Sequence, residues 1–145
     1  MRNHSQARSQ SSVGWLNPVW VGRVVSWLAA LPCAISAAMK FTTRPELLRG
    51  MAHLGLPESL AKPLGLLELL CVVVYLIPGT SVLGAILFTG YVGGAILTHL
   101  RIGEPVLIQI ALGVLVWLGV YLREPRLREL LPLRRTLKSR EVGSR

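Results

Sequence analysis

The feature that most constrains this chain is a long stretch that is almost free of charge. From residue 63 to residue 100 the only charged side chain is Glu68, and from residue 102 to residue 122 the only one is Glu104. An amphipathic helix of a soluble protein needs a polar face, and neither stretch supplies one. With 52% hydrophobic and 16% charged residues, the chain is expected to be a membrane protein rather than a soluble or disordered one.

Four apolar segments are long enough, or nearly long enough, to cross a bilayer. A helix rises about 1.5 Å per residue, so a hydrocarbon core of about 30 Å takes about 20 residues. The first segment reaches this length when Arg23 and Lys40 extend towards the interfaces. The segment that contains Glu68 is the shortest, and taken alone it also fits a buried core helix. The predicted spans are residues 19–41, 60–77, 81–100 and 105–122.

Between the first two spans, a short helix is expected to lie on the outer membrane surface. Pro45 can begin this helix, and Gly55 and Pro57 can end it. Its apolar residues fall on one face, as in an interfacial helix; they are Leu47, Leu48, Met51 and Leu54. The predicted fold is therefore all-α, a four-helix transmembrane bundle with a short interfacial helix in the first outer loop. This helix either covers the bundle or forms a lid over an outer cavity.

The net charge of +9 is concentrated near the ends of the chain. From Arg123 onward there are eight Arg or Lys residues and three Glu, and Arg2 and Arg8 precede the first span. An even number of spans with basic ends predicts that both termini are cytoplasmic and that the protein lies in the cell membrane. We interpret residues 1–18 as a disordered basic leader, residues 19–122 as the membrane domain and residues 123–145 as a basic tail. This tail is expected to bind anionic lipid headgroups rather than nucleic acid.

No group of residues in the sequence has the spacing of a metal, haem or thiol-disulfide site. Cys33 and Cys71 are single residues in separate spans, and we expect them to pack as small apolar side chains. His4, His53 and His99 are far apart in the sequence and in expected depth. The sequence also contains no nucleophile–base pair and no nucleotide-binding loop, so we predict no metal and favour a protein that is not an enzyme.

Glu68 is the residue that most needs a partner. In a helix that begins near residue 60, its carboxylate is expected about 10 Å below the outer surface. A charge at the centre of a span costs about 2.5 to 3.5 kcal/mol, so Glu68 should face a cation or a wet cavity. We expect Lys40, Tyr91, His99 and Arg101 to converge with it on an outward-opening polar pocket. The alternative, that Glu68 only pairs with Lys40 or a backbone group to fix the helix register, stays open.

The third predicted span combines a polar stripe with several small residues. Tyr91 and Thr98 share one face of this helix, and His99 is one position away from it. Glycine allows membrane helices to approach closely, so this span is expected to be the centre of packing. Its glycines are Gly84, Gly90, Gly93 and Gly94.

Three stretches of the chain carry a recognisable pattern: GLLELLCVVVYLIP at 65–78, PGTSVLGAILFTGYVGGAILTHLRIGEP at 78–105 and WLGVYLREPRLRELLPLRR at 117–135. Together with Lys40 and the GLP at 55–57, they resemble the DoxX-like family of small four-helix membrane proteins over residues 20–135. The resemblance implies a four-helix transmembrane bundle. It also implies a set of recurrent polar positions without an assigned role, which we take as candidate site residues: Lys40, Glu68, Thr89, Tyr91, His99 and Arg101.

The resemblance leaves three classes of function open. Some relatives in the broader DoxX group are subunits of quinone-linked sulfur oxidation or associate with redox and stress enzymes, so quinone is a cofactor by analogy only. We expect an accessory or ligand-binding protein in a redox-related membrane assembly, with a redox enzyme as its partner. A quinone-linked oxidoreductase subunit that uses Glu68 and His99 is the first alternative. A small transporter or channel is the second, and it requires a homo-oligomer because four short helices enclose only a narrow path.

Overall fold

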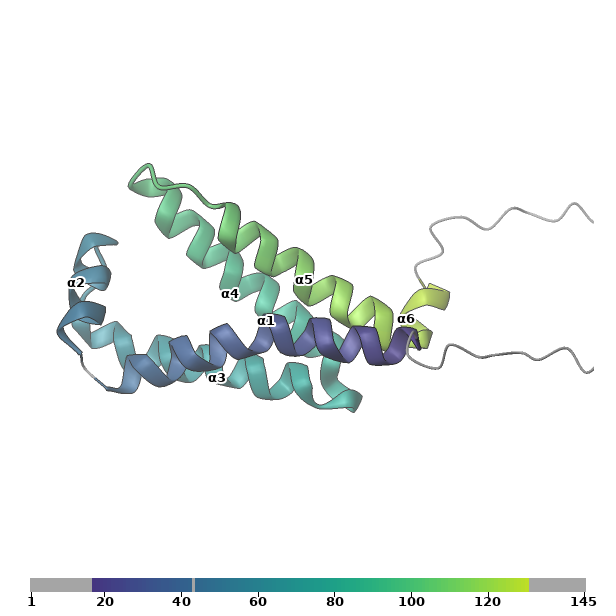
Figure 1. Cartoon of the computed structure of the whole chain (residues 1–145). Helices are drawn as coiled ribbons and strands as arrows, with labels where there is room; N and C mark the ends of the chain where they lie inside the picture. Colours follow the sequence, from purple (N-terminus) through teal and green to yellow (C-terminus); the bar gives the residue numbers. More distant parts are fainter. Residues whose placement is uncertain (1–16, 43, 131–145) are drawn as a thin grey trace, which may run out of the picture.

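The computed structural model describes residues 17–42 and 44–130, and every regular element in this part is helical (Figure 1). α1 (Pro18–Phe41) is followed by α2 (Pro45–His53), the 3-10 turn η1 (Glu58–Leu60) and α3 (Ala61–Leu76). A second 3-10 turn, η2 (Pro78–Thr80), leads into α4 (Ser81–Arg101), α5 (Leu107–Arg123) and α6 (Pro125–Leu130). Most of the predicted leader and most of the basic tail lie outside the described residues.

Three segments of the structure are long and apolar enough to cross a bilayer. They are α1, the continuous segment Glu58–Leu76 and the continuous segment Pro78–Arg101. α5 is also apolar but has 17 residues, because Pro105 and Val106 remain outside the helix. The predicted all-α fold with several apolar helices is confirmed, and the chain is a multi-pass membrane protein. The fourth span and the interfacial position of α2 stay predictions.

The four long helices pack in a closed ring. α1 contacts α3 and α5, and α4 contacts the same two helices, so each helix has two main neighbours. Figure 1 shows that both ends of the described chain lie at one end of the bundle, while α2 and the α4–α5 loop lie at the other. We call these the terminal end and the loop end.

One aromatic side chain organises the core near the terminal end of the bundle. Tyr75 of α3 is fully buried, and its ring meets Phe88 of α4 edge-on, with ring centroids 5.4 Å apart. The Tyr75 hydroxyl donates to the Val116 carbonyl oxygen of α5 at 3.0 Å and lies 3.1 Å from Ser26 Oγ of α1. One side chain therefore joins all four helices of the ring.

Two glycines make room for this tyrosine. A Cβ atom at Gly84 would overlap the backbone of Tyr75, and a Cβ atom at Gly119 would overlap the Tyr75 hydroxyl. The expectation that the glycines of α4 allow close packing is therefore correct for Gly84. It is wrong for Gly90, Gly93 and Gly94, where a Cβ atom would meet no atom of another helix within 4 Å in the described part of the chain.

Candidate functional site

The buried acid of α3 forms an ion pair with the lysine near the end of α1. Lys40 Nζ donates to Glu68 Oε2 at 2.7 Å and to Ser36 Oγ at 2.6 Å. Ser36 in turn donates to the same carboxylate oxygen at 3.2 Å. Glu68 is 3% exposed and the Lys40 side chain 13%, so both charges are largely removed from solvent and neutralise each other. The pair thereby joins α1 to α3 inside the apolar part of the bundle.

A third helix reaches this ion pair through Tyr91. Its side chain on α4 lies beside the Glu68 carboxylate, close to Cys33 and Cys71, which are both buried and free. The structure thus brings together Lys40, Glu68 and Tyr91 from the predicted site. Sequence reasoning missed Ser36, although it precedes Lys40 by four residues, a spacing at which side chains on one helix meet.

The other two basic residues of the predicted pocket have partners at the loop end. His99 Nδ1 donates to Glu104 Oε2 at 2.7 Å, and His53 Nε2 of α2 donates to Glu104 Oε1 at 2.8 Å. Arg101 Nη2 donates to the Leu54 carbonyl oxygen at 2.5 Å. These contacts fasten α2 to the end of α4. The hydrogen bonds from His99 and His53 also lower the pKa of the Glu104 carboxyl, because they stabilise its charged form.

The residues predicted to form one polar pocket therefore lie in three places. Lys40, Glu68 and Tyr91 meet between α1, α3 and α4, whereas His99 and Arg101 bind loop-end groups. Thr89 lies in a groove between α4 and α5. It cannot share a face of α4 with Tyr91, because residues two positions apart on a helix do not face the same neighbour.

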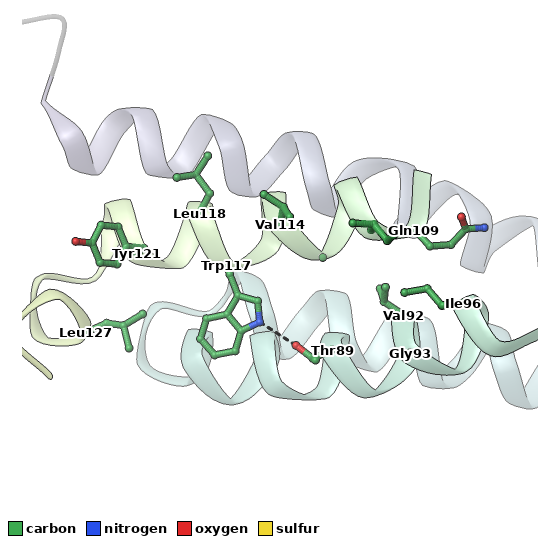
Figure 2. A pocket seen from close by; sticks show the side chains of 12 residues that line it. Thr89, Val92, Gly93, Ile96, Gln109, Val114, Trp117, Leu118, Tyr121 and Leu127 are labelled. Carbon is green, nitrogen blue, oxygen red and sulfur yellow. Dashed lines mark hydrogen bonds between the residues drawn. The ribbon is translucent and has the colours of Figure 1, made fainter. Parts of the chain in front are cut away.

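This groove has a volume of about 660 Å³ (Figure 2). Figure 2 shows the indole of Trp117 reaching from α5 towards α4, where its Nε1 donates to Thr89 Oγ1 at 2.9 Å. Apart from this pair the walls are nearly all apolar. They include Val92 and Ile96 of α4, Val114 and Leu118 of α5, and Leu127 of α6.

Among the polar groups that line the groove, one buried atom has no hydrogen-bond partner within the described residues. Thr89 Oγ1 donates to the Ala85 carbonyl oxygen at 2.8 Å while it accepts from Trp117, so these two side chains satisfy each other. Gln109 also lines the groove, and its Oε1 is buried without a hydrogen-bond partner in the described residues. Gln109 and Tyr121 mark the two ends of the groove in Figure 2. At about 1.5 Å per helical residue, the twelve positions between them correspond to about 18 Å along α5. Sequence reasoning missed Gln109, although it is the one amide in the apolar run 105–122.

Comparison with known proteins identifies a family for the region that holds these sites. The model of the DoxX-like family matches residues 24–121, from α1 to the end of α5. No curated protein and no solved structure matches the chain. The matched range includes the ion pair, the loop-end contacts and nearly the whole α4–α5 groove.

Proposed function

Since the chain belongs to the DoxX-like family, we propose that it binds a lipid-soluble small molecule in the groove between α4 and α5. The observation that carries the proposal is the groove itself, which combines about 660 Å³ of apolar space with a buried Gln109 Oε1 that has no partner among the described residues. The proposed role is accessory: a ligand-binding subunit of a redox-related assembly in the cell membrane, with both termini cytoplasmic and a redox enzyme as its partner.

The chemistry of the groove defines the class of ligand. In a bilayer the competing lipid tails are as apolar as the groove walls, so apolar contact alone gives little preference for one molecule. Preference must come from shape and from a hydrogen bond to Gln109. A molecule with a long apolar tail and a hydroxyl at one end would supply the missing donor.

A quinol fits this description. Its ring hydroxyl would donate to Gln109 Oε1, and its tail would lie along Val114 and Leu118 towards the terminal end. Its quinone form would instead accept a hydrogen bond from the amide nitrogen of Gln109. The bound molecule would supply two-electron redox chemistry, and this chain would contribute binding and orientation.

The proposal can be tested by filling the groove from one side. Gly113 lines the groove, and a Cβ atom there would meet only Val92 Cγ1, at 3.9 Å, so Gly113→Leu is expected to occupy the cavity without moving the helices. Gly90→Leu is the matched control, because a Cβ atom at Gly90 meets nothing and Gly90 does not line the groove. We expect Gly113→Leu to weaken the binding of decylubiquinol to the purified protein by about tenfold or more, and Gly90→Leu to leave it unchanged.

A second variant separates the polar contact from the shape of the groove. Gln109→Leu keeps the apolar walls and removes the acceptor, so it should weaken quinol binding while the retention of plain acyl chains stays the same. Equal quinol binding by the wild type and Gly113→Leu would show that the ligand, if bound at all, lies elsewhere.

The ion pair between α1 and α3 favours a second candidate function. Ionisable groups inside a membrane are expensive, and they often lie on proton or ion pathways. In a quinone-linked oxidoreductase subunit or a small transporter, Glu68 would exchange a proton next to Lys40 and Tyr91. Glu68→Gln keeps a hydrogen bond but cannot carry charge. Loss of turnover or transport in a folded Glu68→Gln variant would support this candidate, whereas unchanged activity would leave the pair with the role of fixing α1 against α3.

A further inference from the structure

A second, smaller cavity lies at the terminal end of the bundle, apart from the α4–α5 groove. Its volume is about 270 Å³, and its lining includes Arg23 and Trp27 of α1, Ser81 of α4, and Arg123 and Glu124 at the end of α5. We propose that Arg23 and Arg123 bind a phosphate group here, that of an anionic phospholipid in the leaflet at the terminal end.

The first argument is the charge that the cavity leaves unbalanced. Two arginines and one glutamate line it, and within the described residues neither arginine forms an ion pair with a carboxylate. Arg123 is half-buried, so part of the hydration of its charge is lost. A partly desolvated cation without a counter-ion is costly, and an anion in the cavity would offset this cost.

The second argument is that Arg123 is held in place by neutral groups only. Its Nη2 donates to the carbonyl oxygen of Tyr75 at the end of α3, and its guanidinium lies over the Tyr75 ring, 4.7 Å from the centroid. Its Nε is buried and has no hydrogen-bond partner in the described residues. These contacts position the guanidinium, and its remaining N–H groups are donors for the forked hydrogen bonds that guanidinium groups form with phosphate.

The third argument concerns the source of the phosphate. Trp20 and Trp27 are both exposed at this end of α1, and Arg23 lies over the Trp20 ring at 5.7 Å. Exposed tryptophans on membrane helices are typical of the headgroup level of a bilayer. Trp20 lies in the first turn of α1 and contacts Arg23, which lines the cavity, so the two arginines lie where phospholipid phosphates are found.

Arg23→Gln is the decisive variant, because Arg23 is exposed and no hydrogen bond of the described residues depends on it. Arg126→Gln is the matched control: Arg126 is exposed at the same end but does not line the cavity. The protein would be purified in mixed micelles of phosphatidylglycerol and phosphatidylcholine, and retained lipids counted by native mass spectrometry. We expect Arg23→Gln to weaken phosphatidylglycerol binding about fivefold, the effect of one basic residue near an anionic surface, and Arg126→Gln to leave it nearly unchanged.

Inorganic phosphate alone is the second arm and separates the two sources of the ligand. In one outcome, phosphate raises the melting temperature of the wild type as much as phosphatidylglycerol does, and Arg23→Gln abolishes both effects. That result would support a phosphate-binding site and contradict a phospholipid as the source of the phosphate. Equal losses of phosphatidylglycerol binding in Arg23→Gln and Arg126→Gln would indicate general attraction to a charged surface and would overturn the proposal. A wild type that responds to neither ligand would also overturn it.

Two further variants sharpen the test. Arg123→Lys keeps the charge but loses the forked hydrogen bonds of the guanidinium, so it should weaken phosphatidylglycerol binding as well. Gly113→Leu should retain phosphatidylglycerol, so this proposal and the groove proposal can fail independently.

Discussion

The two sides of α4 differ in how closely the neighbouring helix approaches. Towards α3, Gly84 lies against the backbone of Tyr75, whose ring is fully buried near the terminal end of the bundle. Towards α5, Gly93 and Gly113 line a groove of about 660 Å³ that is crossed by the indole of Trp117. At the α3–α4 contact, glycine lets two backbones approach closely. At the α4–α5 contact, no side chain of the described residues fills the space left by the glycines, so a groove remains.

The difference follows from what holds membrane helices together. Helices in lipid gain little from the hydrophobic effect, so a contact stays closed only where it gains van der Waals packing or hydrogen bonds. The contacts of α3 with α1 and α4 have both, through the Lys40–Glu68 pair and the packing around Tyr75. The contact of α4 with α5 has the Trp117–Thr89 hydrogen bond and a cavity. We therefore expect changes at the closed contacts to reduce stability, and changes at the open one to affect binding.

The largest effect is expected at the ion pair of the closed α1–α3 contact. Lys40→Met leaves Glu68 without its cation, and removing one partner of a buried pair costs about 3 kcal/mol or more of the free energy of unfolding. Lys62→Met is the control, because Lys62 is exposed and forms no ion pair in the described residues. Denaturation in detergent measures both. The double variant Lys40→Met/Glu68→Met should recover most of the lost stability. If Lys40→Met were as stable as the control Lys62→Met, the ion pair would not be important for stability.

The next effect compares two glycines of the same helix. Gly84→Ala places a methyl group into the Tyr75 backbone, and overpacking of this kind costs about 2 kcal/mol of the free energy of unfolding. Gly93→Ala points into the groove, meets nothing within 4 Å, and should keep or slightly raise stability because alanine favours a helix. Thermal unfolding of the two variants side by side measures the difference. If both lose stability equally, the contrast between the two sides of α4 is wrong.

The helices of this fold could be predicted because a bilayer leaves the backbone few choices. Inside lipid every backbone N–H and C=O group must be satisfied within the segment, so a long uncharged run is helical. This argument explains α1 and α4, which end beside the charged residues Lys40 and Arg101. It fixes the starts of α3 and α4 to within one residue, but not that of α5, where Pro105 and Val106 stay outside the helix.

The site was harder to predict, because spacing shows which residues share a helix face but not which neighbour that face meets. Glu68 needed a cation, and Lys40 supplies it, since charge in lipid leaves few alternatives. Thr89 and Tyr91 are close in sequence, yet their partners are Trp117 on α5 and the carboxylate on α3. The groove itself has no signal in the sequence, because an absence of packing depends on the volumes of side chains from both helices.

The mildest test lies at the loop end, where α2 is fastened by exposed polar contacts. The hydrogen bonds from His99 and His53 lower the pKa of Glu104, so the charged carboxylate stabilises the folded loop end. This contribution is present above the ordinary pKa of the carboxyl group, and it is lost as the pH falls through the lower value of the folded protein. Amide hydrogen exchange of α2, corrected for the intrinsic pH dependence, should therefore stay slow at neutral pH and increase only in acid.

Glu104→Gln should make the amide exchange of α2 fast at neutral pH as well. Exchange around Tyr75 should stay unchanged, because the two ends of the bundle share no polar contact in the described residues. Glu58→Gln is the control: Glu58 is an exposed carboxylate at the same end without an ion pair in the described part. Because salt and water screen exposed pairs, Glu104→Gln should lower the free energy of unfolding much less than Lys40→Met does. If Glu104→Gln instead unfolded the whole bundle, the loop end would be essential to the stability of the bundle. The distinction between contacts that stabilise the fold and contacts that do not would then be wrong.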